Sequence, residues 1–91
     1  MSKLGKVKKI TLYSTQTCGF CRAAKSLLEN KGISYKEIDV SSDLELRGQM
    51  MTKANGRRSV PQIFINDAHL GGFSDLYSLQ QSGKLDKLLG D

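Results

Sequence analysis

The stretch TQTCGFC, residues 15–21, contains the only two cysteines of the 91-residue chain and joins a predicted strand to a predicted helix. Residues 7–13, just before it, are rich in β-forming apolar side chains, which indicates a buried strand. From Gly19 to Lys31 apolar residues recur at helical spacing, which predicts a helix with Thr17 as its N-cap. Cys18 is therefore expected where that helix begins.

The rest of the chain continues the alternation of strands and helices. The further elements predicted are a strand over 33–40, a helix capped by one of residues 41–43 and ending near Ala54, strands over 60–65 and 68–71, and a leucine-rich helical stretch interrupted at residues 82–83. This order, β-α-β-α-β-β-α, predicts a single α/β domain over residues 1–91 with one sheet flanked by helices. Residues 1–6 form a basic lead that we expect to be flexible.

Composition excludes several classes of protein. A 38% hydrophobic and 25% charged chain is ordinary for a soluble domain, and no apolar run is long enough to cross a bilayer. The N-terminus lacks the apolar stretch of a secretory signal, so we expect a cytoplasmic protein without a membrane partner. The net charge is +5, but the basic clusters at residues 3–9 and 53–58 are not interleaved with aromatics, so no nucleic-acid partner is expected.

The cysteine pair could hold a metal, form a structural disulfide or carry out chemistry. A closed zinc site takes four ligands, whereas this motif supplies two and His69 is the only histidine. A disulfide closing so short a loop stabilises little, and a reducing cytoplasm opposes it. The start of a helix favours a thiolate on Cys18, and Arg22 and Lys25 in the next turn are expected to add positive charge. Cys21, one turn further in, should be more buried and remain a thiol, which suits attack by Cys18 and resolution by Cys21.

With these features the sequence resembles the glutaredoxins, small members of the thioredoxin-fold family, in their two-cysteine form. The resemblance runs from about residue 9 to residue 89, and rests on LYS at 12–14, TCGFC at 17–21, SVPQIFI at 59–65 and GGFSDL at 71–76. It implies a thioredoxin-like fold with a four-stranded mixed sheet. It also implies a glutathione-dependent thiol–disulfide oxidoreductase, or glutathione–disulfide transhydrogenase, that acts on disulfide-containing or glutathionylated proteins.

The resemblance also assigns residues to a glutathione site. It implies a cis Val60–Pro61 bond facing Cys18, close approach of the ligand at residues 71–72, and a helix start at Ser74 and Asp75 that receives the γ-glutamyl group. The implied glutathione contacts are Tyr13, Thr15, Phe20, Arg47, Val60, Pro61, Gly72, Ser74 and Asp75. A one-residue slip would exchange Arg47 for Gln49. Basic residues at 53, 57 and 58 are candidates for steering the anionic tripeptide.

Two departures from the family pattern lead to further expectations. Gly19 and Phe20 replace the Pro-Tyr usual between two cysteines, and the glycine should loosen the helix start. In the family such motifs are associated with a glutathione-ligated [2Fe–2S] cluster, so the alternative to a monomeric enzyme is a cluster-bridged dimer in which Cys18 of each subunit is the metal ligand. Thr15 stands where the family commonly has lysine, which predicts weaker glutathione binding and a less favoured Cys18 thiolate.

Overall fold

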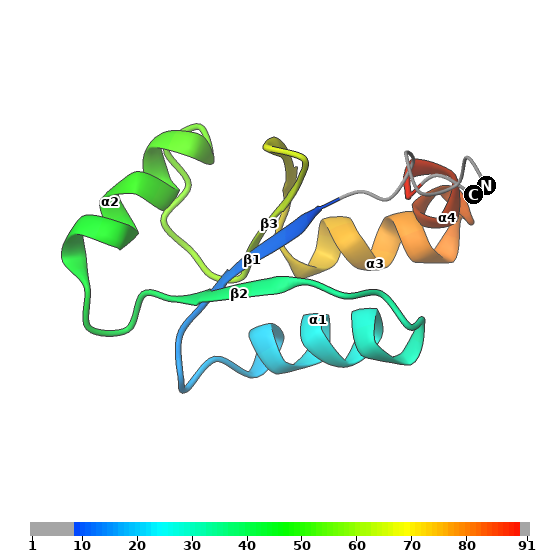
Figure 1. The fold of residues 1–91 in the computed structure, drawn as a ribbon, viewed down its shortest axis with the longest axis horizontal. Coiled ribbons are helices and arrows are strands. Elements are labelled where there is room, and N and C mark those ends of the chain that lie inside the picture. The colour runs from blue at the N-terminus through cyan, green and yellow to red at the C-terminus, as the bar shows by residue number, and fades with distance from the viewer. Residues whose placement is uncertain (1–8, 90–91) are drawn as a thin grey trace.

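The computed structural model describes residues 9–89, which form a four-stranded mixed sheet with helices on both faces (Figure 1). In chain order the elements are β1 (Ile10–Ser14), α1 (Gly19–Asn30), β2 (Lys36–Asp39), α2 (Leu44–Lys53), β3 (Gln62–Ile65), β4 (Ala68–Gly71), α3 (Phe73–Gln81) and α4 (Lys84–Leu88). The expected order of elements is confirmed, with the C-terminal helical stretch divided in two. The predicted lead over residues 1–6 and the first residues of the predicted first strand lie outside the described residues.

The sheet order is β2-β1-β3-β4, so β1 and β3 are its central strands. β1 runs parallel to β2 and antiparallel to β3, with Tyr13 opposite Gln62. β3 and β4 form a hairpin through Asn66 and Asp67, both at positive φ, as a tight two-residue turn between twisted strands requires. The C-terminal end of β1 and the N-terminal end of β3 therefore lie side by side, at the same end of the sheet.

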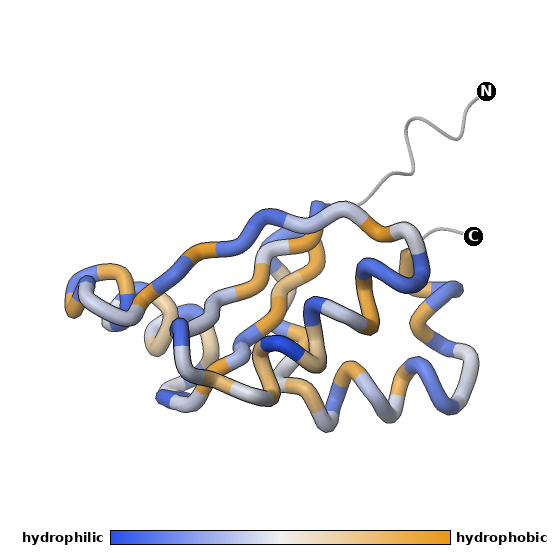
Figure 2. The backbone as a smooth tube through the Cα atoms, turned by 90° about the horizontal axis from the view of Figure 1, so that it is seen from below, coloured by the Kyte–Doolittle hydropathy of each residue, from blue (hydrophilic) through white to orange (hydrophobic). Residues whose placement is uncertain are grey.

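Two clusters of buried side chains cover the two faces of the sheet. The first joins β1 and β3 to α1, α3 and α4, and its buried members are Ile10, Leu12, Ala24, Leu28, Ile63, Leu76 and Leu85. The second packs α2 and the end of β2 onto the opposite face through Tyr13, Val40, Met50, Ala54 and Phe64. Figure 2 shows hydrophobic positions recurring through the central strands and along the helices, between hydrophilic ones. These clusters fix α1 and α3 on one face, and α1 begins at the cysteine motif.

Element boundaries depart from the sequence pattern where local hydrogen bonds compete with it. The predicted strand over 33–40 begins only at Lys36, because the N–H of Ile33 donates to Leu28 O (2.9 Å) and finishes the preceding helix. The predicted strand over 60–65 begins at Gln62, after a turn. Gly83, at φ 78°, separates α3 from α4 at the predicted interruption. Among the predicted caps of α2, Asp43 is the one used, and its carboxylate accepts from the N–H of Leu46 (3.0 Å).

Removing core volume from β1 should destabilise the whole domain. Leu12 is fully buried between the sheet and the helices (0% exposed), so Leu12→Ala is expected to lower the free energy of unfolding by about 2–5 kcal/mol. Urea unfolding followed by circular dichroism measures the change. Leu44→Ala is the matched control, because Leu44 is 88% exposed and its removal should change stability by less than about 0.5 kcal/mol. Equal losses in the two variants would contradict this description of the core.

Candidate active site

Cys18 occupies the N-cap of α1, the position that sequence analysis gave to Thr17. Its backbone is extended, and its sulfur accepts a hydrogen bond from the backbone N–H of Cys21 (3.0 Å). The sulfur can therefore replace a hydroxyl as the cap, since it lies against the unpaired N–H groups of the first turn. The Cys18 thiol also donates to the carbonyl of Val60 (Sγ–O 3.5 Å). Half-buried between a helix N-terminus and a backbone carbonyl, Cys18 is the more accessible sulfur of the pair.

Cys21 lies one helical turn further in and is 1% exposed, which confirms the predicted burial. Burial, followed by the hydrogen bond with Cys18, raises the pKa of Cys21 to about 12, and the backbone of Thr15 and the charge of Lys25 offset this only in part. Near neutral pH Cys21 is therefore a thiol. Both cysteines are free thiols in the structure.

A cleft of about 220 Å³ opens next to Cys18. It is formed by the first turn of α1, the loop before β3 and the first turn of α3, and its lining residues are Phe20, Arg57, Ser59, Val60, Pro61, Gly72, Phe73 and Ser74. The Val60–Pro61 peptide bond is cis, as expected. Five of the nine predicted glutathione contacts therefore meet in one place: Phe20, Val60, Pro61, Gly72 and Ser74.

One wall of this cleft is aromatic. The ring of Phe20 is 66% exposed and stacks on Phe73, with ring centroids 5.9 Å apart and planes 24° apart. Phe73 in turn lies 5.8 Å from Tyr77, further along α3. The stacking fixes an exposed phenylalanine two residues from Cys18, although the helix begins at a glycine.

The opposite end of the cleft is the N-terminus of α3, where the structure corrects a predicted cap. Gly72 is the N-cap, so Ser74 lies within the first turn and Asp75 is the third helical residue. The Asp75 carboxylate accepts from the N–H of Gly72 (2.9 Å) and pairs with Arg57 (3.4 Å). A Cβ on Gly72 would lie 3.3 Å from the carbonyl oxygen of Pro61, so glycine lets two walls of the cleft approach each other.

Four predicted contacts are not among the residues that line the cleft: Asp75, described above, and Tyr13, Thr15 and Arg47. Tyr13 is 4% exposed and packs edge-on against Phe64 in the core. Thr15 lies half-buried in the loop before Cys18. Arg47 extends from α2 to donate to the carbonyl of Arg58 (2.9 Å), so it braces the loop that carries Val60. The glutathione contact of all nine residues remains a prediction.

Ser59 and Phe73 line the cleft but were not among the predicted contacts. The available signal was adjacency, because Ser59 precedes Val60 and Phe73 follows Gly72 within two stretches already singled out. Gln49, the alternative to Arg47, lies elsewhere on α2, at a shallow depression that it shares with Lys53.

Lys25 does not act as the unpaired positive charge that was expected near Cys18. Its ammonium pairs with Glu37 of β2 (2.9 Å), whose carboxylate also accepts from the buried hydroxyl of Ser14 (2.6 Å). The hydrogen bonds from Ser14 and then Lys25 hold the pKa of Glu37 below its ordinary value. The positive charge of Lys25 is thus largely compensated.

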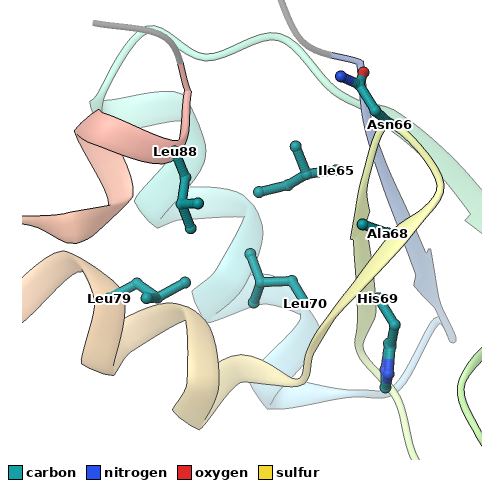
Figure 3. Close-up of a pocket in the computed structure, with 7 residues that line it drawn as sticks. All are labelled: Ile65, Asn66, Ala68, His69, Leu70, Leu79 and Leu88. Atoms are coloured by element: carbon teal, nitrogen blue, oxygen red, sulfur yellow. The ribbon is translucent and has the colours of Figure 1, made fainter.

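A second cavity, of about 490 Å³, lies between the β3–β4 hairpin and the helices α3 and α4 (Figure 3). It is larger than the cleft, but neither cysteine and none of the predicted contacts lines it. Its walls are Ile65, Asn66, Ala68, His69, Leu70, Leu79 and Leu88. The chemistry-bearing groups lie at the smaller cleft, which we therefore take as the candidate active site.

The described residues do not form a metal site. Within residues 9–89, no group of three or more His, Cys, Asp or Glu side chains lies close enough to hold an ion. A [2Fe–2S] cluster takes four ligands, of which one chain offers the accessible sulfur of Cys18, since Cys21 is buried. The expected cluster would draw its other ligands from a second chain and from glutathione. No helix in the described part of the chain is long and apolar enough to span a membrane.

Comparison with known proteins agrees with the geometry. The family model for glutaredoxin matches residues 10–70. A probable glutaredoxin of Synechocystis is 49% identical over 81 residues, which cover 89% of this chain and 92% of that protein. The solution structure of a glutaredoxin from Brucella melitensis has a TM-score of 0.83 at 44% identity, covering 94% of this chain and 92% of that one. A buckwheat glutaredoxin in complex with glutathione has a TM-score of 0.80 at 26% identity, covering 97% and 84% of the two chains. The expected thioredoxin-like fold is confirmed.

The Glu37 contacts should make part of the stability depend on pH. Because the pKa of Glu37 is lower in the folded than in the unfolded chain, its contribution is present above the unfolded pKa and is lost as pH falls through the folded value. The carboxylate is partly exposed, so Glu37→Gln should lower the free energy of unfolding by less than about 1 kcal/mol near neutral pH. Urea unfolding at a series of pH values measures this. The difference from wild type should shrink below about pH 4, and one that stays constant with pH would contradict the assignment.

Proposed function

The chain belongs to the glutaredoxin family and is therefore a thiol oxidoreductase, and from this we propose that it is a glutathione-dependent thiol–disulfide oxidoreductase of the two-cysteine type. The observation that carries the proposal is the position of Cys18. Its sulfur lies at the N-terminus of α1, 3.5 Å from the carbonyl oxygen of Val60, at the edge of a cleft lined by five of the predicted glutathione contacts.

The first step is attack by the Cys18 thiolate on a disulfide. The backbone N–H of Cys21 donates to this sulfur, and the positive end of the helix favours its negative charge. With a glutathionylated protein, the Cys18 sulfur bonds to the glutathione sulfur and the protein thiolate leaves, taking a proton from water. The glutathionyl group then remains on Cys18.

Two routes return the enzyme to its reduced form. A second glutathione thiolate attacks the glutathione sulfur of the mixed disulfide, which releases glutathione disulfide and the Cys18 thiolate. When the substrate is a protein disulfide, the sulfur of Cys21 attacks Cys18 in the mixed disulfide, and its proton passes to the departing protein thiolate. Two glutathiones then reduce the Cys18–Cys21 disulfide. The first route needs Cys18 alone, whereas the second needs Cys21 as well.

The cleft walls suggest how glutathione is oriented. The peptide groups of its cysteine pair with the backbone of Val60, and its chain lies along Phe20 and Phe73. Its γ-glutamyl carboxylate meets the N–H groups at the start of α3, near Ser74, and Asp75 faces its ammonium group. The fold similarity to a buckwheat glutaredoxin solved with glutathione supports this choice of ligand.

We further propose that the substrates are glutathionylated or disulfide-containing proteins and that the chain works as a monomer. The cytoplasm is the compartment in which the reaction would run toward reduction, because glutathione keeps thiols reduced there. The cluster-bridged dimer is not carried forward, because no observation in residues 9–89 favours it.

Substituting the two cysteines separately should split the two routes. Cys18→Ser is expected to abolish reduction of both glutathione mixed disulfides and protein disulfides, since it removes the nucleophile. Cys21→Ser should keep the first activity and lower the second at least about tenfold. A coupled assay that follows glutathione disulfide formation measures both. Turnover by Cys18→Ser would show that the nucleophile is misassigned.

Adding charge at Thr15 should strengthen glutathione binding. Thr15→Lys places an ammonium where the family commonly has one, so the KM for glutathione should fall about two- to fivefold, as for a partly exposed ion pair. Gln16→Lys is the matched control, because Gln16 is exposed and its side chain is directed to Asp39 (3.2 Å). An unchanged KM in Thr15→Lys, or an equal fall in both variants, would remove the argument for a specific contact.

A further inference from the structure

A fully buried amide lies directly behind the loop that forms the cleft wall. Gln62, the first residue of β3, is 0% exposed. Its Nε2 donates to the backbone carbonyl of Ser59 (3.0 Å) and to the Ser59 hydroxyl (3.3 Å), and its Oε1 lies 2.7 Å from Nε2 of His69 in β4. One buried side chain therefore connects the loop at the cleft to β4, the other strand of the hairpin.

The direction of these hydrogen bonds follows from chemistry. A backbone carbonyl only accepts, so the amide nitrogen of Gln62 must face Ser59 and its oxygen must face His69. The His69 ring consequently carries its proton on Nε2. Burial, followed by the nearby charge of Arg57, holds the pKa of His69 below its ordinary value, which keeps the ring neutral near neutral pH. The ring also packs against Phe64, with centroids 5.1 Å apart, so the acceptor oxygen of Gln62 is anchored to a packed side chain.

The segment between these contacts is the one that meets Cys18. Ser59 is held by the Gln62 side chain, and the Gln62 backbone is held in register opposite Tyr13 of β1. Val60 lies between the two fixed points, with its carbonyl 3.5 Å from the Cys18 sulfur. Both the position and the orientation of the Val60 peptide groups are thus determined by Gln62 from inside the protein.

We propose that Gln62 is a positioning residue: through Ser59, and anchored by His69, it sets the Val60 backbone in the geometry that receives the ligand beside Cys18. Gln62 does not touch the reacting atoms. The inference rests on the proposed function in so far as the ligand is the glutathione group of a mixed disulfide. An inert packing role for the same amide would alter stability but not the geometry at Val60.

Two variants change the amide with little change in volume. Gln62→Met keeps the length of the side chain but neither donates nor accepts strongly, so both contacts to Ser59 are lost. Gln62→Glu keeps the acceptor oxygen that faces His69, but its ionised carboxylate cannot donate to Ser59, so it removes the Ser59 contacts while retaining the His69 anchor. Ile65→Ala is the control for general destabilisation, because it removes apolar volume from the same strand, at the end away from the cleft.

The first measurement is the NMR order parameter of the Val60 backbone amide, which requires no assumption about the substrate. Gln62→Met should lower this order parameter from near the rigid value of about 0.85 toward the flexible range below about 0.6, while Ile65→Ala should leave it close to wild type. An unchanged order parameter in Gln62→Met would overturn the proposal whatever the enzyme's substrate is.

The second measurement is steady-state reduction of a glutathione mixed disulfide. Gln62→Met should raise the KM about fivefold or more with a smaller change in kcat, and the rate of Cys18 alkylation by iodoacetamide should stay within about twofold of wild type. Gln62→Glu should raise the KM as Gln62→Met does. A lower Val60 order parameter with an unchanged KM would overturn the link to ligand binding. Absence of turnover in the wild-type protein would instead refute the proposed function, and the order parameter would still decide the positioning.

Discussion

The antiparallel pairing of β1 with β3 is the constraint on which the site depends. With Tyr13 opposite Gln62, the end of one central strand lies beside the start of the other. The chain leaving β1 reaches Cys18 within a few residues, and the chain entering β3 has just passed Val60. A register slip would turn both strands' core residues toward the wrong faces, so the burial of Leu12 and Ile63 fixes the alignment. The hydrophobic core thereby sets the distance between the sulfur and the carbonyl that faces it.

Because α1 starts at the motif, its two cysteines lie in different environments. Cys18 caps α1 and is reached from the cleft, whereas Cys21 faces the core, and burial keeps it protonated. Their separation by one helical turn also keeps them close enough for the Cys21 N–H to reach the Cys18 sulfur. In the proposed mechanism, position relative to the helix end, more than sequence neighbours, decides which cysteine attacks and which resolves. Lys25 contributes less positive charge than its sequence position suggests because Glu37 neutralises it.

Sequence was sufficient for the order of the elements and for placing Cys18 at the start of α1. Periodicity and turn residues locate β1, α1 and the β3–β4 hairpin, and the motif at their junction places Cys18. Contacts between distant residues could not be predicted in this way. No local pattern shows that Glu37 would pair with Lys25 or that Arg47 would brace the loop at Arg58. The cap of α1 was misplaced for a related reason: hydroxyl side chains are the usual caps, and a sulfur supplies the acceptor here.

The outer strand β2 has a consequence of a different kind. It is four residues long, lies at the edge of the sheet, and carries exposed charged side chains at Lys36, Glu37 and Asp39. An open strand edge attracts other extended chains, and shortness and charge are the features that discourage such pairing. A domain whose chemistry brings it against loosened or oxidised polypeptides meets this hazard at each encounter. Under the proposed function, a partner is joined through sulfur while the short, charged edge at β2 discourages its addition to the sheet, so release remains a chemical step.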